Sequence, residues 1–85
     1  MAERIVTYSK DALRTLSRCP VDVSKRIRAK VAQYARDPKS LKANVKALQG
    51  ELGFYRLRID DWRVVFSEDF EVVAVIKIAS RGSIY

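Results

Sequence analysis

The sequence predicts an α+β fold in which two helices pack on one face of an antiparallel sheet. Three observations lead to this prediction. Two segments in the first half repeat apolar residues at helical spacing, the last third alternates apolar and polar residues with a period of two, and turn residues separate the segments. A chain of 85 residues is expected to form a single domain over residues 1–85.

The first two elements follow from local signals. Residues 4–8 consist of Arg4 followed by β-branched and aromatic residues, which predicts a short N-terminal strand. Ser9 then offers an N-cap oxygen, and apolar residues recur until Pro20, which predicts a helix of about three turns. The apolar stripe of this helix consists of Ala12, Leu13, Leu16 and Cys19. Cys19 is interpreted as a core residue, because no base is visible that would activate its thiol.

A second helix is predicted to begin near Pro20 and to end at Asp37-Pro38, since the residue before a proline disfavours helix. Its apolar face consists of Val23, Ile27, Val31, Tyr34 and Ala35, and Lys25, Arg26, Arg28 and Lys30 surround that face. Almost no residues separate the two helices, so an antiparallel helical hairpin is expected.

Residues 38–53 are predicted to form a basic, partly irregular connector. The segment holds a proline, two glycines and three lysines. The spacing of Leu41, Val45 and Leu48 admits a single helical turn. Lys42 and Lys46 are candidate contacts for RNA phosphates, although basic residues here also suit an acidic protein or plain solvation.

The last third is predicted to be a three-stranded β-meander. Residues 54–59 and 62–67 flank Asp60-Asp61, which are interpreted as turn residues, and a third strand runs from about residue 71 to residue 79. A two-residue loop fixes the pairing of the first two strands. The expected pairs on the core side are Ile59 with Trp62, Leu57 with Val64 and Tyr55 with Phe66.

The same register places three arginines on the opposite face. Arg58 is expected directly opposite Arg63, with Arg56 beside them. Like charges directly opposite each other destabilise a sheet. The arrangement therefore indicates an anionic ligand, although a solvated sheet face is the plainer interpretation.

The third strand is predicted to face the core with its entirely apolar side, which consists of Val72, Ala74, Ile76 and Ile78. A three-residue loop over residues 68–70 is expected, because it places Lys77 on the outer face with Arg63, and a buried unpaired lysine is unfavourable. Arg81 and Tyr85 follow just beyond the end of this strand.

The net charge indicates the kind of partner, and the composition excludes several kinds of site. The chain has 17 Lys and Arg against 10 Asp and Glu, a net charge of +7, and residues 1–50 alone carry 12 basic and 4 acidic side chains. A polyanion or an acidic protein is the expected partner. The absence of histidine and the single cysteine exclude disulfides within the chain, Cys/His zinc sites and histidine-based triads. No metal and no cofactor are expected.

Neither a membrane span nor a secretory signal peptide is expected from the sequence. No segment approaches the roughly 20 apolar residues that span a membrane, and residues 1–4 lack the start of a signal peptide. A cytoplasmic protein without a membrane partner is expected.

Three segments, residues 48–58, 55–66 and 80–85, together with the order of the elements, resemble the RelE/ParE superfamily of bacterial toxins. The resemblance covers essentially the whole chain. It implies the toxin of a type II toxin–antitoxin system, which an antitoxin neutralises by wrapping around it. RelE-like members cleave mRNA in the ribosomal decoding site, whereas ParE-like members poison DNA gyrase.

The resemblance also implies site residues. The basic pair on the strand after the connector falls on Arg56 and Arg58, the arginine that opens the next strand falls on Arg63, and the terminal pair falls on Arg81 and Tyr85. Glu51 lies where some ribosome-dependent relatives use a carboxylate as base. Many members carry histidine or lysine directly before the terminal arginine, whereas this chain carries Ser80, which removes one candidate proton carrier.

RNA cleavage without a metal needs a base for the 2′-hydroxyl, cations for the transition state and an acid for the leaving 5′-oxygen. Tyr85 is the candidate base, because Arg81 and Arg63 would lower its proton affinity. The plainer interpretations are that Tyr85 anchors the C-terminus on the sheet and that Glu51 is a solvated loop acid.

The preferred function is therefore a ribosome-dependent, metal-independent mRNA endoribonuclease that inhibits translation. A ParE-like gyrase inhibitor, and a catalytically weakened member that acts as an antitoxin-binding or autoregulatory module, are the alternatives. The expected partners are an antitoxin with an acidic segment, the ribosome and mRNA, and operator DNA only through the antitoxin complex.

Overall fold

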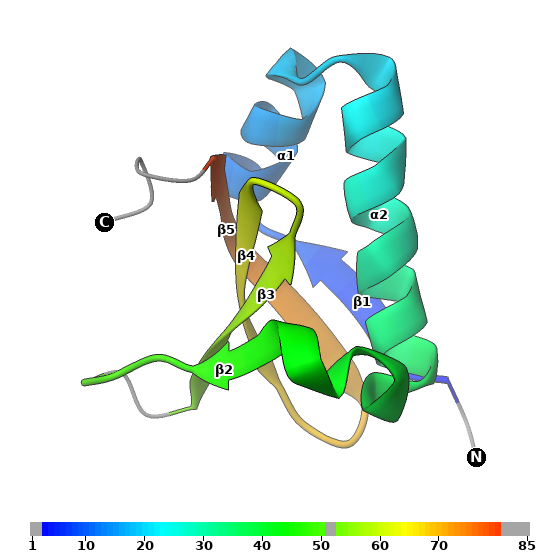
Figure 1. Ribbon diagram of the computed structural model, residues 1–85, viewed down its shortest axis with the longest axis vertical. Helices are drawn as coiled ribbons and strands as arrows, with labels where there is room; N and C mark the ends of the chain where they lie inside the picture. Colours follow the sequence, from blue (N-terminus) through cyan, green and yellow to red (C-terminus); the bar gives the residue numbers. More distant parts are fainter. Residues whose placement is uncertain (1–2, 51–52, 81–85) are drawn as a thin grey trace.

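A computed structural model describes residues 3–50 and 53–80. Within these ranges the elements are β1 (Ile5–Tyr8), α1 (Lys10–Arg18), α2 (Val21–Arg36), the 3-10 helix η1 (Pro38–Asn44), β2 (Val45–Ala47), β3 (Phe54–Ile59), β4 (Trp62–Glu68) and β5 (Val72–Ser80). The strands form one sheet in the order β1-β5-β4-β3-β2, where β1 and β5 are parallel and the other neighbours antiparallel. Figure 1 shows α1 and α2 together on one side of the sheet. The α+β class is confirmed.

The helical hairpin forms as predicted, with two corrections in α1. The Ser9 hydroxyl accepts a hydrogen bond from the Ala12 N–H at 3.0 Å, so the N-cap is confirmed. Ala12 and Leu16, which lie four residues apart, are the buried residues of α1, whereas Leu13 is 45% exposed because it lies to the side of that narrow stripe. Cys19 follows the helix as its C-cap and is only partly buried.

The connector holds more structure than the sequence predicts. Residues 38–44 form η1, and residues 45–47 form β2, which adds a fourth antiparallel strand beside β3. The three strands of the predicted meander are present as β3, β4 and β5, and β2 is an additional strand that the sequence did not predict. A three-residue strand is stabilised by hydrogen bonds to a neighbouring strand rather than by a local pattern, so the sequence alone gives little sign of it. Gly50, at φ 78°, supplies the left-handed conformation where the chain turns back toward β3.

The register of the β3–β4 hairpin is confirmed. Ile59 pairs with Trp62, and Arg58 pairs with Arg63. Asp60 in the loop adopts a left-handed φ of 53°, a conformation that aspartate tolerates better than most residues. A two-residue loop therefore sets which side chains of both strands face the helices.

The predicted register of β5 is wrong. Glu68 pairs with Val73, so the turn spans residues 69–72 and is one residue longer than expected. Val73 and Val75 are buried, whereas Val72 and Ala74, which were predicted to face the core, are only partly buried. The longer turn reverses the two faces at the start of the strand. A β-bulge at Ile76, which pairs with no residue of β4, then restores the expected facing for the rest of β5.

The core lies between the helices and the inner face of the sheet. Its largest fully buried side chains are Phe66, Ile27, Leu57, Val31, Val64, Val73 and Val75. Trp62, which was expected to face the core, packs against this cluster and is partly buried. None of the helices in the described part of the chain is long and apolar enough to cross a membrane.

Candidate functional site

The face of the sheet that points away from the helices carries five basic side chains, contributed by β2, β3, β4 and β5. We call it the cationic face, and it consists of Lys46, Arg56, Arg58, Arg63 and Lys77. The inner face uses the alternate positions of the same strands, such as Leu57 and Val64, which are buried. The alternation of side chains along each strand is therefore enough to place the core residues on one face and the basic residues on the other.

The register arranges these side chains in two neighbouring rows. Lys46 pairs with Arg56, Arg56 with Val65, and Val65 with Lys77. In the next row, Arg58 pairs with Arg63. Directly opposed side chains of antiparallel strands have Cβ atoms about 5 Å apart, so the two rows concentrate positive charge within a few strand spacings.

Hydrogen bonds hold the hairpin end of this face in place. The Arg63 guanidinium donates to the carbonyl oxygens of Asp60 and Trp62, each at 3.2 Å. The Asn44 side chain donates to the Arg58 carbonyl at 3.3 Å and so fixes β3 from the η1 side. Arg63 thus stabilises the loop between β3 and β4, and its guanidinium has further N–H groups that can bind a ligand.

In the part of the chain that the structure describes, no carboxylate forms an ion pair with Lys46, Arg58, Arg63 or Lys77. Glu68 at the end of β4 pairs instead with Arg4. It also accepts a hydrogen bond from the Tyr34 hydroxyl at 2.7 Å.

The remaining acids of the hairpins serve local structure. Asp60 forms an ion pair with Arg26 of α2, on the helix side of the hairpin. The Asp69 carboxylate accepts the backbone N–H groups of Glu71 and Val72, and these hydrogen bonds lower the pKa of Asp69. Two acids that are close in sequence to the cationic face therefore have partners elsewhere.

The structure brings together five of the basic residues that the sequence singled out and separates a sixth. Lys46 joins the cationic face because β2 pairs with β3. Lys42 lies on η1 and lines a different hollow of about 340 Å³, together with Tyr34 of α2. Glu51, Arg81 and Tyr85 lie outside the described residues, so their roles stay predictions.

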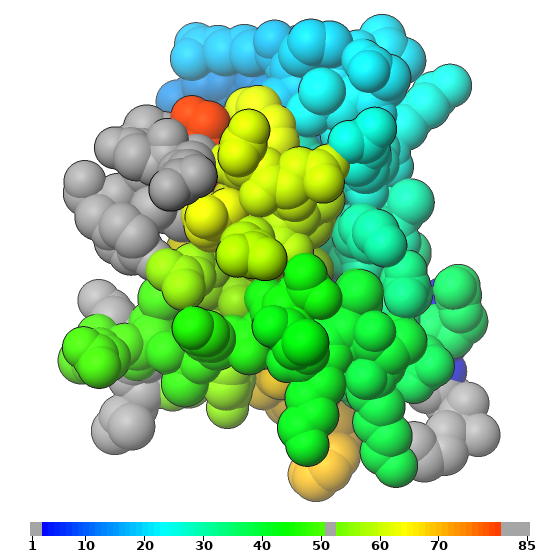
Figure 2. Space-filling view, viewed as in Figure 1, coloured from blue at the N-terminus to red at the C-terminus, as the bar shows by residue number. Residues whose placement is uncertain are grey.

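A second surface was not anticipated from the sequence. Figure 2 shows that α2, η1 and the β3–β4 hairpin meet on one face of the molecule. A hollow of about 380 Å³ lies at this junction, and Arg26, Lys30 and Asn44 are among its lining residues. The charges on α2 were visible in the sequence, but their meeting with η1 depends on tertiary packing.

In the described ranges, no group of three or more Asp, Glu, His or Cys side chains gathers in a way that would hold a metal ion. The arginine and lysine side chains of the cationic face can bind anions, and arginine adds bidentate geometry.

The family model for the ParE toxin of the type II toxin–antitoxin system parDE matches residues 6–85. No curated protein sequence matches the chain.

Several solved structures share the fold. The archaeal RelE–RelB complex from Pyrococcus horikoshii OT3 matches with a TM-score of 0.78 at 23% identity, covering 96% of this chain and 99% of that one. The intact E. coli RelBE toxin–antitoxin complex matches with a TM-score of 0.73 at 21% identity, with the same coverage of 96% and 99%. The YoeB dimer from Staphylococcus aureus matches with a TM-score of 0.71 at 19% identity, covering 89% of this chain and 94% of that one.

Proposed function

We propose that this chain, which belongs to the family of ParE toxins of type II toxin–antitoxin systems, arrests growth by cleaving mRNA on the ribosome. The observation that carries the proposal is the register that sets Arg58 directly opposite Arg63, without a carboxylate partner for either in the described ranges. Such a pair destabilises an isolated sheet. It favours a polyanion that neutralises both side chains, and an RNA backbone is such a polyanion.

The cationic face suits the charge that develops during RNA cleavage. When a base removes the proton of the 2′-hydroxyl, the 2′-oxygen attacks the neighbouring phosphorus, the bond to the 5′-oxygen breaks, and that oxygen takes up a proton. Arginines stabilise the phosphorane-like transition state through charge-assisted hydrogen bonds. We assign Arg58 and Arg63 to the reacting phosphate, and Lys46, Arg56 and Lys77 to the flanking backbone.

Proton transfer is assigned on the family resemblance. Tyr85 acts as the base, and Arg81 lowers the proton affinity of Tyr85 and serves the leaving oxygen. Glu51 is the second candidate for the base. Since Ser80 stands where many relatives carry a histidine or lysine, we expect slower cleavage than in those relatives.

Inhibition of DNA gyrase is the second candidate function. The matching family model is that of ParE toxins, and ParE-like members poison gyrase. In this case the cationic face contacts gyrase or its DNA and performs no chemistry. A third function, in which the chain is a weakened toxin that mainly binds the antitoxin, is favoured only by Ser80.

The proposal also names partners. A cognate antitoxin is expected to carry an acidic segment, because residues 1–50 have eight more basic than acidic side chains. The ribosome and mRNA are direct partners in the first function. Operator DNA is contacted only through the antitoxin complex.

Induction of the toxin in bacteria, followed by primer extension on a translated mRNA, tests the proposal. Cuts within codons that require translation support cleavage on the ribosome. Intact mRNA together with double-strand DNA breaks would contradict it and support the gyrase function. The Tyr85→Phe variant then tests the base, since loss of a positioned acid or base lowers cleavage by about 10²- to 10⁴-fold. Full cleavage by this variant would move the role to Glu51.

A further inference from the structure

The turn between β4 and β5 presents a fully exposed phenylalanine. Phe70 is 99% exposed, the highest value among the exposed large hydrophobic residues of the described ranges. Hydrogen bonds hold the turn that carries it. The Asp69 carboxylate accepts the N–H groups of Glu71 and Val72 at 2.7 and 2.8 Å, and the Asp69 N–H donates to the Val72 carbonyl at 3.0 Å. Phe70 is therefore an apolar anchor on a preorganised turn, which lowers the entropy lost on binding.

Acidic side chains flank this anchor. Asp69 and Glu71 stand on either side of Phe70 in the sequence, and both are exposed. Within the described ranges, neither carboxylate forms an ion pair. In a chain with a net charge of +7, the turn is therefore an apolar tip with local negative charge. Such a tip is complementary to a hollow that combines apolar surface with basic side chains.

A hollow of this kind lies at the same end of the chain. Its volume is about 340 Å³, and it is lined by Tyr34, Pro38 and Val45 together with Lys39 and Lys42. Pro38 is exposed and Val45 only partly buried, so both offer apolar surface to a partner. The two lysines are exposed, and neither forms an ion pair with a described carboxylate. We call this space the η1 hollow, and it is large enough for a phenylalanine ring.

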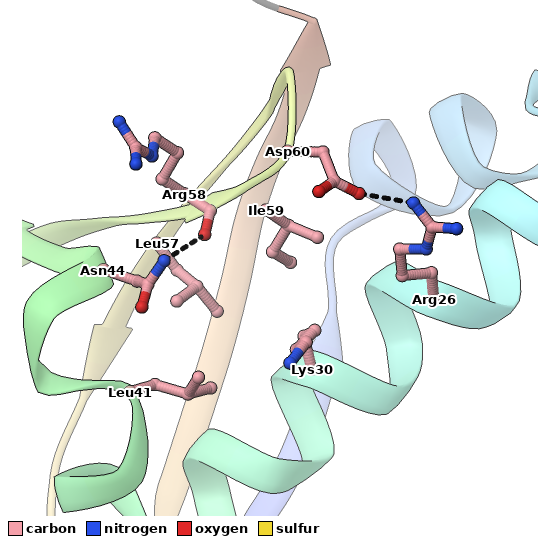
Figure 3. Close-up of a pocket in the computed structure, with 8 residues that line it drawn as sticks. All are labelled: Arg26, Lys30, Leu41, Asn44, Leu57, Arg58, Ile59 and Asp60. Carbon is pink, nitrogen blue, oxygen red and sulfur yellow. Dashed lines mark hydrogen bonds and ion pairs between the residues drawn. The ribbon is translucent and has the colours of Figure 1, made fainter.

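The larger hollow between α2, η1 and β3, which Figure 3 shows, is less suited to an apolar anchor. Its apolar lining residues are Leu41, Leu57 and Ile59, which are only 7%, 1% and 4% exposed. Because their side chains are already covered, a ring placed there would gain little apolar contact. The η1 hollow is therefore the one that fits Phe70.

The turn and the η1 hollow are neighbours within one copy of the chain. Tyr34, which lines the hollow, donates its hydroxyl to Glu68 at 2.7 Å, and Glu68 precedes Phe70 by two residues. Figure 2 shows the segment around residue 70, in orange, at the same lower end as η1, in green. Phe70 does not enter the hollow of its own chain, because it is fully exposed. A two-fold axis at this end brings each Phe70 to the hollow of the other copy, so two identical contacts form.

We propose that two copies of this chain associate through a two-fold interface in which each Phe70 enters the η1 hollow of the other copy. The ring packs on Pro38 and Val45 of the other copy, and Glu71 pairs with its Lys42. The choice of a second copy rests on charge complementarity, because one chain holds both the acidic, apolar turn and the basic, apolar hollow. A nucleic acid is disfavoured as the partner of this turn, since its phosphates would meet acidic side chains.

The interface is separate from the cationic face, so the inference does not rest on RNA cleavage. Arg63 lies near the start of β4, at Trp62–Glu68, whereas Phe70 follows the end of that strand. Arg58 stands opposite Arg63 and is equally distant from the turn along the sheet. Cleavage per chain is therefore expected to be unchanged in the Phe70→Ser variant, whatever the outcome of the association measurements.

Sedimentation equilibrium of the full chain, separated from its antitoxin, tests the proposal. In about 0.15 M salt the screening length is about 8 Å, so close charge pairs outweigh the net charge of the two copies. We expect the average mass to rise from that of one chain toward that of two as the concentration approaches about 1 mM. The mass of a single chain throughout, or a mass above that of two chains, would overturn the two-fold interface.

The Phe70→Ser variant tests the anchor. Association should weaken by at least about 100-fold, because both contacts lose a buried ring. The matched control is Val21→Ser, which changes a valine that is 70% exposed at the first residue of α2, whereas Tyr34 lies near the end of that helix. The control should change the association by less than about 3-fold, as is usual for surface substitutions. Equal effects in the two variants would mean that the copies meet elsewhere, and the proposal would fail.

An exchange of charges tests the pairing of Glu71 with Lys42. The Glu71→Lys and Lys42→Glu variants each place like charges in both contacts, and each should associate about 10-fold or more weakly than the unmodified chain. When the two variants are mixed, both contacts of the mixed pair again join opposite charges. Association should then return to within about 3-fold of the unmodified chain. A mixture that associates no more tightly than either variant alone would overturn the proposed contact.

Discussion

Arginine has two different surroundings in this toxin. Arg4, whose side chain is 12% exposed, pairs with Glu68, donates to the Tyr34 carbonyl at 3.2 Å and lies over the Tyr34 ring at 5.2 Å from its centre. Arg58 and Arg63 face each other on the open side of the sheet without a carboxylate partner in the described ranges.

The difference separates the two uses of charge in the fold. The Arg4 cluster joins the segment before β1 to α2 and to the end of β4, so its charges hold distant parts of the chain together. Among the described residues no carboxylate forms an ion pair with Arg58 or Arg63, so this pair is expected to weaken the hairpin slightly. Side chains of the first kind should matter for stability, and those of the second kind for ligand binding.

The largest effect is expected for activity on the cationic face. The Arg58→Gln variant should lower mRNA cleavage on programmed ribosomes by about 10²- to 10³-fold, as is typical when a donor to the transition state is lost. Single-turnover cleavage measures it. The Arg14→Gln variant on the exposed side of α1 makes the same charge change away from this face and should stay close to the unmodified toxin. Equal loss in both variants would mean that only net charge matters.

Next in size is a loss of stability in the Arg4 cluster. The Arg4→Met variant leaves the Glu68 carboxylate without its cation in a mostly buried place, which typically lowers the free energy of unfolding by about 2–4 kcal/mol once partial exposure is allowed for. Urea unfolding followed by tryptophan fluorescence measures it. Cleavage per folded molecule should not change, and a specific loss of cleavage with normal stability would erase the distinction between the two kinds of arginine.

A smaller effect concerns pH. Burial, and then the hydrogen bond to Glu68, raise the pKa of Tyr34 above its ordinary value. A tyrosine whose pKa is raised by folding contributes stability below its unfolded pKa of about 10 and loses that contribution as the pH rises further. The toxin should therefore lose stability above pH 10. The Tyr34→Phe variant, which lacks the group, should show a flatter decline in unfolding experiments between pH 9 and 11, and an identical decline would contradict the assignment.

The sequence predicts the β3–β4 hairpin well, but it predicts neither the register of β5 nor the existence of β2. The two-residue loop at Asp60-Asp61 leaves a single register, in which Ile59 pairs with Trp62. Because side chains alternate between the two faces of a strand, this register alone places the arginines on the open face. In β5 both faces are rich in apolar residues, so the alternation does not show which face is buried. The bulge at Ile76 also exchanges the buried and the exposed face within the strand. Strand β2 depends on its contact with β3, which a local pattern does not encode.

The same limit applies to the candidate site. Arg58 and Arg63 could be paired from loop length, and Lys46 was singled out only as a basic residue of the connector, because its place beside Arg56 requires β2. The hollow between α2, η1 and β3, by contrast, is lined by residues from Arg26 of α2 to Asp60 after β3, which only tertiary packing brings together. The charges of Arg26 and Lys30 were visible, but nothing local related them to Leu57.

The smallest expected effect is a gain in stability in the Arg58→Gln variant, and it tests the opposed arginines most directly. Removing one of two like charges at directly opposed positions should raise the free energy of unfolding by about 0.2–1 kcal/mol. The Arg63→Gln variant removes the same repulsion but also the hydrogen bonds to the Asp60 and Trp62 carbonyls, so its net change should be near zero. The Arg14→Gln variant reports what the protein gains merely by lowering its net charge of +7. Urea midpoints at low salt rank the three variants, and the gain of Arg58→Gln over Arg14→Gln should shrink in about 1 M salt, where the screening length falls to about 3 Å. A loss of stability in Arg58→Gln would mean that this arginine supports the hairpin, and the inference of an anionic ligand from the opposed pair would then fail.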